Sequence, residues 1–304
     1  MNALVISGGG SKGAFAGGVA QYLIEEMGRD YDLYLGTSTG SLLVSHLALQ
    51  NVDKIKKVYT SVNQKSIFSQ NPFTIKKRHG GMEIGINHFN VLLNFFKGRK
   101  TFGESQNLKK LIFKTITKEE FSTLKNSKKD IVVTVSNLSM NEVEYKSIKD
   151  FSYEEFLEWI WISCNYTPFM SLVQKNGCEY ADGGLGIMVP IEEAVKRGAR
   201  NIDVIILQTE VTQLNKLPSR NAFSLLTSMF SFVLDRIEHQ NIKIGKFAAN
   251  QHNAIINFYY TPTILTTNSL IFDKKKMETW WHSGFEYAKL KNKETSQLGP
   301  EINQ

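Results

Sequence analysis

Cysteine is scarce in this sequence, because its 304 residues include only Cys164 and Cys178. Two cysteines are too few for a disulfide framework, and neither has a partner at metal-ligand spacing, so a disulfide-stapled scaffold and a zinc-type site are excluded. A single bridge between the two cysteines stays open, although a reducing compartment is the natural expectation. Long hydrophobic runs are lacking too. The longest largely apolar stretch, 222–234, contains serines and a threonine and stops at Asp235, so it is too short and too polar to cross a bilayer. We expect it to form a buried helix.

The amino terminus lacks a basic region followed by a long apolar segment, since the first glycines already begin at Gly8. This pattern argues against a secretory signal and predicts a cytoplasmic protein. The net charge of +7 would suit an anionic partner, either a lipid surface or a nucleic acid. No basic patch is interleaved with stacking aromatic residues, so no nucleic-acid partner is expected. A solvated lysine-rich surface explains the charge equally well.

Short β-rich runs alternate with segments of helical periodicity along the chain. The expected strands cover 3–7, 33–35, 131–135, 202–207 and 255–259, and the first two are followed by helical patterns at 14–24 and 41–49. Such alternation predicts an α/β fold with a mainly parallel central sheet and helices on both faces, in three layers.

Residues 51–129 interrupt this rhythm and predict a partly helical insertion over the carboxyl edge of the sheet. Within it, 89–96 is rich in phenylalanine and leucine, and a basic cluster at 97–100 follows. Most amphipathic helices bury their apolar side, so packing on the core is the favoured prediction for this segment. The alternative is a peripheral contact with a membrane surface, in which the apolar residues rest on lipid.

A glycine loop, Gly8-Gly9-Gly10-Ser11-Lys12-Gly13, stands between the first strand and the first helix. Backbone N–H groups at a helix start can bind developing negative charge. The spacing Gly8-x-Gly10-x-x-Gly13 also fits a dinucleotide-binding fingerprint, with Asp30 or Asp32 near the distance expected for a ribose-binding acid. The Walker pattern fails, because glycine rather than serine or threonine follows Lys12.

A second motif, Gly36-Thr37-Ser38-Thr39-Gly40, lies at the end of the next strand. Glycines two residues to either side of Ser38 are what a sharp strand-to-helix turn requires, and such a turn lifts a serine hydroxyl into reach of a substrate. The alternative is an ordinary turn in which Ser38 only caps the following helix. The two motifs together provide a nucleophile and a site for negative charge, which acyl transfer needs.

The third motif, Asp182-Gly183-Gly184, would alone be read as a turn. The three motifs in this order make the chain resemble the patatin-like phospholipase family of lipid acyl hydrolases. The stretches 163–169 and 185–194 resemble the family's segments before and after the aspartate, so the likeness covers about 3–200. The chain departs from the family at Ile187 and Met188, where an asparagine is usual, and this departure concerns the loop that holds Asp182.

The resemblance implies a hydrolase of lipid metabolism and lipid degradation that cleaves a lipid or acyl ester without cofactor or metal. It implies Ser38 as nucleophile and Asp182 as base, with backbone donors from Gly9, Gly10 and Thr39 forming an oxyanion hole. The remaining motif residues are implied to shape these loops: Gly8, Lys12, Gly13, Gly36, Gly40, Gly183 and Gly184. A carboxylate is a weak base at its ordinary pKa of about 3.9, so burial would have to raise the pKa of Asp182. We expect 3–200 to form the catalytic unit and 201–304 to complete the same domain.

Two other functions remain open at this point: an oxidoreductase that binds a dinucleotide through Gly8–Gly13, and a catalytically silent lipid-binding module. The histidines offer a further alternative base, because His239 and His252 follow Asp182 in the order of α/β-hydrolase triads. His239 reads as a helix-surface residue, however, and His46 as a packing residue two turns beyond Ser38.

Overall fold

The central strands consist of nearly continuous apolar residues, because both faces of the sheet are covered. In β1 (Asn2–Ile6), for example, every residue from Ala3 to Ile6 is fully buried. The computed structural model describes residues 1–78, 81–211 and 222–298. The main sheet has eight strands; besides β1 they are β2 (Leu33–Thr37), β5 (Asp130–Asn137), β6 (Glu142–Ser147), β7 (Val173–Lys175), β8 (Cys178–Asp182), β9 (Asn201–Ile206) and β10 (Ile255–Tyr260).

The strand order is β10-β9-β1-β2-β5-β8-β7, and β6 lies on the other edge of β5. The pairs from β10 through β5 are parallel, whereas β6, β7 and β8 form an antiparallel end. The prediction of a mainly parallel α/β sheet is confirmed. β9 and β10 come from the last third of the chain and lie in the same sheet as β1.

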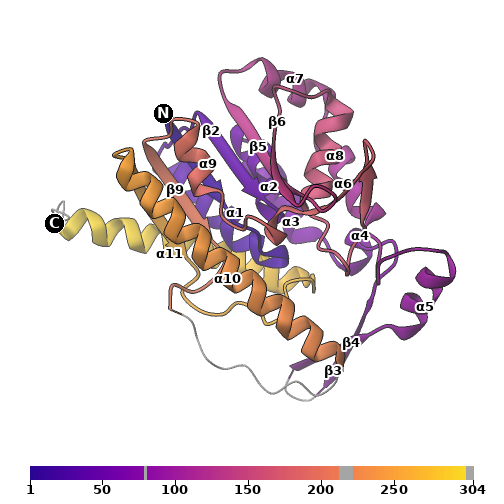
Figure 1. The fold of residues 1–304 in the computed structure, drawn as a ribbon. Coiled ribbons are helices and arrows are strands. Elements are labelled where there is room, and N and C mark those ends of the chain that lie inside the picture. Colours follow the sequence, from indigo (N-terminus) through magenta and orange to yellow (C-terminus); the bar gives the residue numbers. More distant parts are fainter. Residues whose placement is uncertain (79–80, 212–221, 299–304) are drawn as a thin grey trace.

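Helices cover the two faces of the sheet, as predicted (Figure 1). On one face the core includes Phe15, Leu43 and Trp281, and the helices of this side are α1 (Gly13–Gln21), α2 (Thr39–Ala48), α3 (Val52–Ser61), α8 (Tyr153–Ser163) and α11 (Lys274–Leu298). The other face is packed by α9 (Ile191–Lys196) and α10 (Ala222–Gln251), with Ile191 and Ala249 in its core. This arrangement gives three layers.

The segment 51–129 is only in part an insertion over the carboxyl edge. α3 packs against α1 and α2, α6 (Gln106–Thr115) against α8, and α7 (Lys118–Asn126) against α8 and β5, so these helices belong to the covering layer. α4 (Gln64–Ile67) packs against α6, whereas the part that stands apart contains the hairpin of β3 (Phe73–Arg78) with β4 (Gly81–Ile86) and α5 (His88–Phe96) (Figure 1). Its base lies beside 165–171, since the Phe102 amide donates to the carbonyl of Pro168.

Two predictions about apolar helices are wrong. The stretch 222–234 is not a buried helix; it is the first half of the 30-residue α10, and it exposes Leu225, Met229 and Phe232. α5 does not bury its apolar side either, because Phe89 and Phe96 are 75% and 80% exposed. Periodicity showed that these segments are helices but not how much of their surface other elements cover. Within the described parts of the chain, no helix is both long and apolar enough to cross a membrane.

Candidate active site

The glycine loop leaves the carboxyl end of β1 and enters α1 through a short helical turn, Gly10–Lys12. The amide of Gly8 donates to the carbonyl of Met188 (3.3 Å), and that of Ser11 to the carbonyl of Ser269 (2.8 Å). Between them, the amides of Gly9 and Gly10 have no acceptor among the described residues. Gly10 has φ +55°, and a Cβ there would stand 2.3 Å from the carbonyl oxygen of Ser269, so only glycine fits. The loop can therefore offer two backbone donors to a ligand.

Lys12 is half-buried, and its ammonium group lies near the end of β9 and near α10. Its Nζ donates to the carbonyl of Leu207, and Glu238 and Asp235 of α10 attract its charge. Burial lowers the pKa of Lys12 and raises that of Glu238 to about 8. Lys12 of the glycine loop thus bonds to the residue that follows β9 and lies in the field of two α10 carboxylates, a placement that the sequence did not predict.

Ser38 occupies the sharp turn between β2 and α2. Its backbone has φ 53° and ψ −120°, a conformation that is costly for a residue with a Cβ and that is concentrated at functional sites. A Cβ at Gly36 would lie 2.4 Å from the carbonyl carbon of Gly40, and a Cβ at Gly40 would lie 2.3 Å from the carbonyl oxygen of Ile6. Both glycines are therefore required by the turn, as the sequence predicted. The Ser38 hydroxyl makes no capping bond to α2, so the helix-cap interpretation is wrong.

The end of α8 holds this strained turn in place. The amide of Ser38 donates to Oγ of Ser163 (3.0 Å), whose hydroxyl also contacts Oγ of Ser41 (2.8 Å). The thiol of Cys164 donates to the carbonyl of Ser38 (3.0 Å). Thr39 is the first residue of α2, and its amide has no backbone acceptor in the described part of the chain. It is the third candidate donor named from the sequence.

Asp182 meets Ser38 because of how β5 pairs with its neighbours. Thr37, the last residue of β2, pairs with Thr134, and Asp182, the last residue of β8, pairs with the next residue, Val135. The ends of β2 and β8 thus face one another along one edge of β5. The hydroxyl of Ser38 donates to Oδ2 of Asp182 at 2.6 Å.

The other carboxylate oxygen of Asp182 is also occupied. Its Oδ1 accepts the amide of Gly184 at 2.7 Å, which fixes the orientation of the group. The side chain is almost fully buried, and burial raises the pKa of Asp182 to about 7, against the opposing effect of the bonds from Ser38 and Gly184. A Cβ at Gly183 would lie 2.2 Å from the carbonyl of Thr134, so this glycine lets the loop pass close to β5.

The departure at Ile187 and Met188 does not separate Asp182 from Ser38. Met188 packs between the glycine loops, with its side chain beside Gly8 and Gly184. Oδ1 of Asn241, from α10, accepts the amides of Met188 (2.7 Å) and Val189 (3.3 Å). A side chain more than 50 residues away therefore supports the loop, and no local signal could have revealed it.

Tyr59 of α3 contacts both the glycine loop and the start of α2. Its hydroxyl donates to the carbonyl of Gly10 at 2.7 Å and contacts Oγ1 of Thr39, so it touches both motifs that supply candidate donors. No local pattern marks this residue, because its two contacts reach residues 49 and 20 positions away in the sequence.

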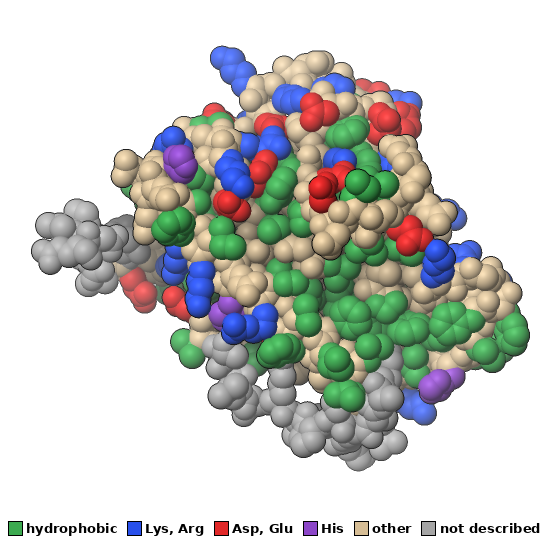
Figure 2. Space-filling view, in the orientation of Figure 1, with side chains coloured by type: hydrophobic (Ala, Val, Ile, Leu, Met, Phe, Trp, Pro, Cys, Tyr) green, Lys and Arg blue, Asp and Glu red, His purple; other side chains and the backbone are tan. Residues whose placement is uncertain are grey.

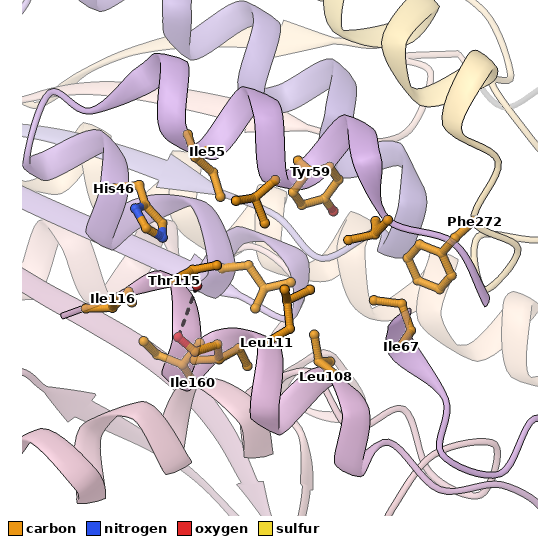
Figure 3. Close-up of a pocket in the computed structure, with 14 residues that line it drawn as sticks. His46, Ile55, Tyr59, Ile67, Leu108, Leu111, Thr115, Ile116, Ile160 and Phe272 are labelled. Carbon is orange, nitrogen blue, oxygen red and sulfur yellow. Dashed lines mark hydrogen bonds between the residues drawn. The ribbon is translucent and has the colours of Figure 1, made fainter. Parts of the chain in front are cut away.

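None of the histidines in the described part of the chain is hydrogen-bonded to Ser38 or Asp182. His46 is buried in the wall of a small apolar cavity of about 50 Å³ between α2, α3 and α6 (Figure 3), and burial lowers its pKa to about 4. His239 lies on the exposed side of α10, and His252 is exposed at the end of that helix. Among the described residues, no three His, Cys, Asp or Glu side chains gather where they could hold a metal ion.

Neither acidic residue that the dinucleotide interpretation needs lies beside the glycine loop. A ribose-binding acid is expected at the carboxyl end of the second strand, beside the glycine loop. Asp32 instead precedes β2, at the opposite end of the sheet, where its Oδ2 accepts the amide of Asn2 (2.8 Å). Asp30, at the same end, pairs with Lys129. The carboxyl end of β2 carries Ser38.

Comparison with known proteins gives the family and a similar fold. The family model for patatin-like phospholipase matches residues 4–195, well over half of the chain. Among solved structures, VipD from Legionella pneumophila has a similar fold, with a TM-score of 0.50 and 14% identity; the match covers 95% of this chain and 66% of VipD, so this chain spans slightly less than two thirds of that protein. No curated protein matches the sequence. On the family match over 4–195, the chain belongs to the patatin-like phospholipase family.

Proposed function

We propose that this protein is a serine acyl hydrolase that cleaves carboxylic esters of lipids through an acyl-enzyme on Ser38. Family membership supports lipid acyl hydrolysis in general. The observation that carries the specific proposal is the 2.6 Å hydrogen bond from Oγ of Ser38, in a strained turn, to a buried carboxylate. A nucleophile within hydrogen-bond reach of an oriented base is the arrangement that covalent catalysis requires.

In the first step, Oγ of Ser38 attacks the ester carbonyl carbon while its proton passes to Oδ2 of Asp182. The negative charge then develops on the carbonyl oxygen, where the amides of Gly9, Gly10 and Thr39 can donate to it. Collapse of this intermediate breaks the ester C–O bond, and the leaving alcohol takes the proton from Asp182. The acyl group remains on Ser38.

In the second step, Asp182 accepts a proton from water as the water oxygen attacks the acyl-enzyme. The new intermediate expels Oγ of Ser38, which takes the proton back, and the fatty acid leaves. A carboxyl group with a pKa near 7 suits this role, because about half of it is ionised at neutral pH and the ionised form is basic enough to accept the serine proton. Besides the attacking water, the groups that act in both steps are side chains and amides of this chain.

Trapping with a fluorophosphonate ester tests the proposal. We expect one covalent adduct, located on Ser38 by peptide mass spectrometry, and none in Ser38→Ala. Ser269→Ala is the matched control, because Ser269 borders the glycine loop through its backbone carbonyl and should leave labelling unchanged. Absence of an adduct on folded protein would favour a catalytically silent lipid-binding module. Hydrolysis of a lipid panel, followed by mass spectrometry of the products, then identifies the ester that is cut.

A further inference from the structure

Two helices expose large apolar side chains on the same side of the molecule. On α5 these are Phe89, Leu92, Phe95 and Phe96, and on the first half of α10 they are Leu225, Met229, Phe232 and Val233. We call these eight residues the apolar face. Figure 2 shows hydrophobic side chains gathered over the region that α5 and the start of α10 occupy in Figure 1. An exposed cluster of this kind marks an interaction surface.

A chain of aromatic rings joins the two helices under this face. Phe95 of α5 contacts Phe102 (6.2 Å between ring centroids), Phe102 contacts Phe169 (5.7 Å), and Phe169 contacts Phe230 of α10 (6.0 Å). Phe230 also contacts Tyr166 (6.0 Å). The apolar face is therefore one surface resting on a common aromatic layer.

The same layer adjoins the candidate active site. Tyr166 follows Asn165, whose carbonyl accepts the amide of Asp182 at 2.9 Å. One aromatic layer thus separates the proposed base from the exposed face. Lipid bound at the apolar face would therefore lie next to the site that is proposed to cleave it.

The charges at the face favour an anionic surface. Residues 88–100 contain the cations Lys97, Arg99 and Lys100 and no carboxylate, and 222–234 carry no charge. Arg99 and Lys100 pair with Glu104 and Glu179, whereas Lys97 is exposed and has no ion-pair partner among the described residues. An isologous contact with a second copy would bring like cations together, which is unfavourable, whereas anionic headgroups would attract them.

We propose that the apolar face docks on an anionic phospholipid bilayer, with α5 and the first half of α10 lying at the interface and Lys97 against the headgroups. This inference extends the proposed function by stating the physical form in which the lipid is met. Helices of this kind bind through buried apolar area and attraction to anionic lipid. Docking itself requires no turnover, so it can be measured separately from catalysis.

Vesicle binding of the Ser38→Ala protein tests the docking. We expect co-sedimentation with vesicles of phosphatidylcholine and phosphatidylglycerol, and weaker binding to phosphatidylcholine alone. Phe96→Glu and Phe232→Glu, each made separately, should lower the partition coefficient at least about tenfold, because each removes an apolar side chain and adds like charge to an anionic surface. Lys97→Gln should lower it about fivefold, and only on the anionic vesicles.

The carboxyl-terminal part of α11, at the opposite end of the molecule, provides matched controls (Figure 1). Leu290 is 60% exposed, close to the 62% of Phe232, so Leu290→Glu should leave binding unchanged, as should Lys293→Gln. Equal losses in Leu290→Glu and Phe232→Glu would overturn the proposal, and so would absence of binding to anionic vesicles. Dissociation of a dimer by Phe96→Glu, without vesicle binding, would assign the face to a second copy instead.

With Ser38 intact, Phe96→Glu and Phe232→Glu should keep the turnover of a short-chain soluble ester while losing that of vesicle lipid. Loss of both activities would place the face within the site and contradict docking. If no ester is cleaved by any variant but vesicle binding follows the predicted pattern, the proposed function fails and the docking stands.

Discussion

Protonation of a single residue, Asp182, should control the pH dependence of activity. Burial raises the pKa of this carboxyl group to about 7, and only its ionised form can accept the proton of Ser38. We therefore expect kcat/KM for a soluble ester to rise with pH through about 7 and then level off. A pH–rate profile checks this, and activity that is flat down to pH 5 would mean that a group of lower pKa acts as base.

Replacement of Asp182 by asparagine should separate activity from stability. Asparagine can still accept the hydrogen bond of Ser38 but cannot take its proton, so kcat should fall about 10²–10⁴-fold. The folded protein keeps the Asp182 proton to about pH 7, whereas the unfolded chain loses it near the ordinary value of 3.8, so this residue makes stability fall as pH rises through that window. Asp182→Asn removes that fall.

The free energy of unfolding of Asp182→Asn relative to the parent should therefore increase between pH 4 and pH 7, by up to about 4 kcal/mol. Urea titrations at several pH values provide the measurement. A variant that is less stable than the parent at pH 8 would show that the carboxylate is needed to hold the loop rather than to react.

At the scale of elements, α3 should affect catalysis through the hydroxyl of Tyr59. Tyr59→Phe leaves the carbonyl of Gly10 and the hydroxyl of Thr39 without this partner, so we expect kcat to fall about tenfold as the donors loosen, with KM little changed. The free energy of unfolding should fall by about 1 kcal/mol. Tyr153→Phe is the control, since Tyr153 donates to the carbonyl of Ile116 (2.8 Å) away from the site. A tenfold loss in both variants would point to general destabilisation.

The parts of this fold that could be predicted from the sequence are those with local causes. The turn at Ser38 needs glycines two residues away, and the glycine loop follows directly from its strand, so both motifs were placed correctly. The support of Ser38 by Ser163, of Gly10 by Tyr59 and of Met188 by Asn241 joins distant segments, and nothing in the local sequence encodes such pairings.

The exposure of α5 and α10 was mispredicted for a related reason. The spacing of apolar residues shows that a helix has an apolar side, but the elements that cover this side are chosen by the whole fold. In α10 the strand side of the helix is covered through residues such as Ala249, while Phe232 faces outward. The same apolar residues would fit a helix whose apolar side is covered and one whose apolar side is exposed.

At the scale of the molecule, Asp203 of β9 ties the last third of the chain to the first strands. Its carboxylate accepts bonds from Arg29, from the hydroxyl of Tyr31 (2.7 Å) and from Asn257 of β10 (2.9 Å). Asp203→Ala leaves the buried hydroxyl of Tyr31 and the half-buried Arg29 and Asn257 without this partner, and should cost about 3–5 kcal/mol. If 201–304 complete one domain with 3–200, denaturation of the variant should show a single transition at lower urea concentration.

Asp30→Ala is the control for this experiment, because Asp30 is largely exposed and its pairing with Lys129 should contribute less than about 1 kcal/mol. Turnover by the folded Asp203→Ala protein at low temperature should equal that of the parent, since Asp203 pairs with Leu4 in the middle of β1 and makes no contact with Ser38 or Asp182. Two separate transitions would show that the carboxyl-terminal part unfolds independently.

The pairing of Thr37 with Thr134 and of Asp182 with Val135 affects how functional members of the family can be recognised in genome sequences. One residue inserted between Thr134 and Val135 would move Asp182 relative to Ser38 by about 3.3 Å along β5. Both residues would still be present in the sequence. A search for the serine and aspartate motifs would still accept such a gene. An uninterrupted β5 is therefore a better criterion for a functional copy than the two motifs alone.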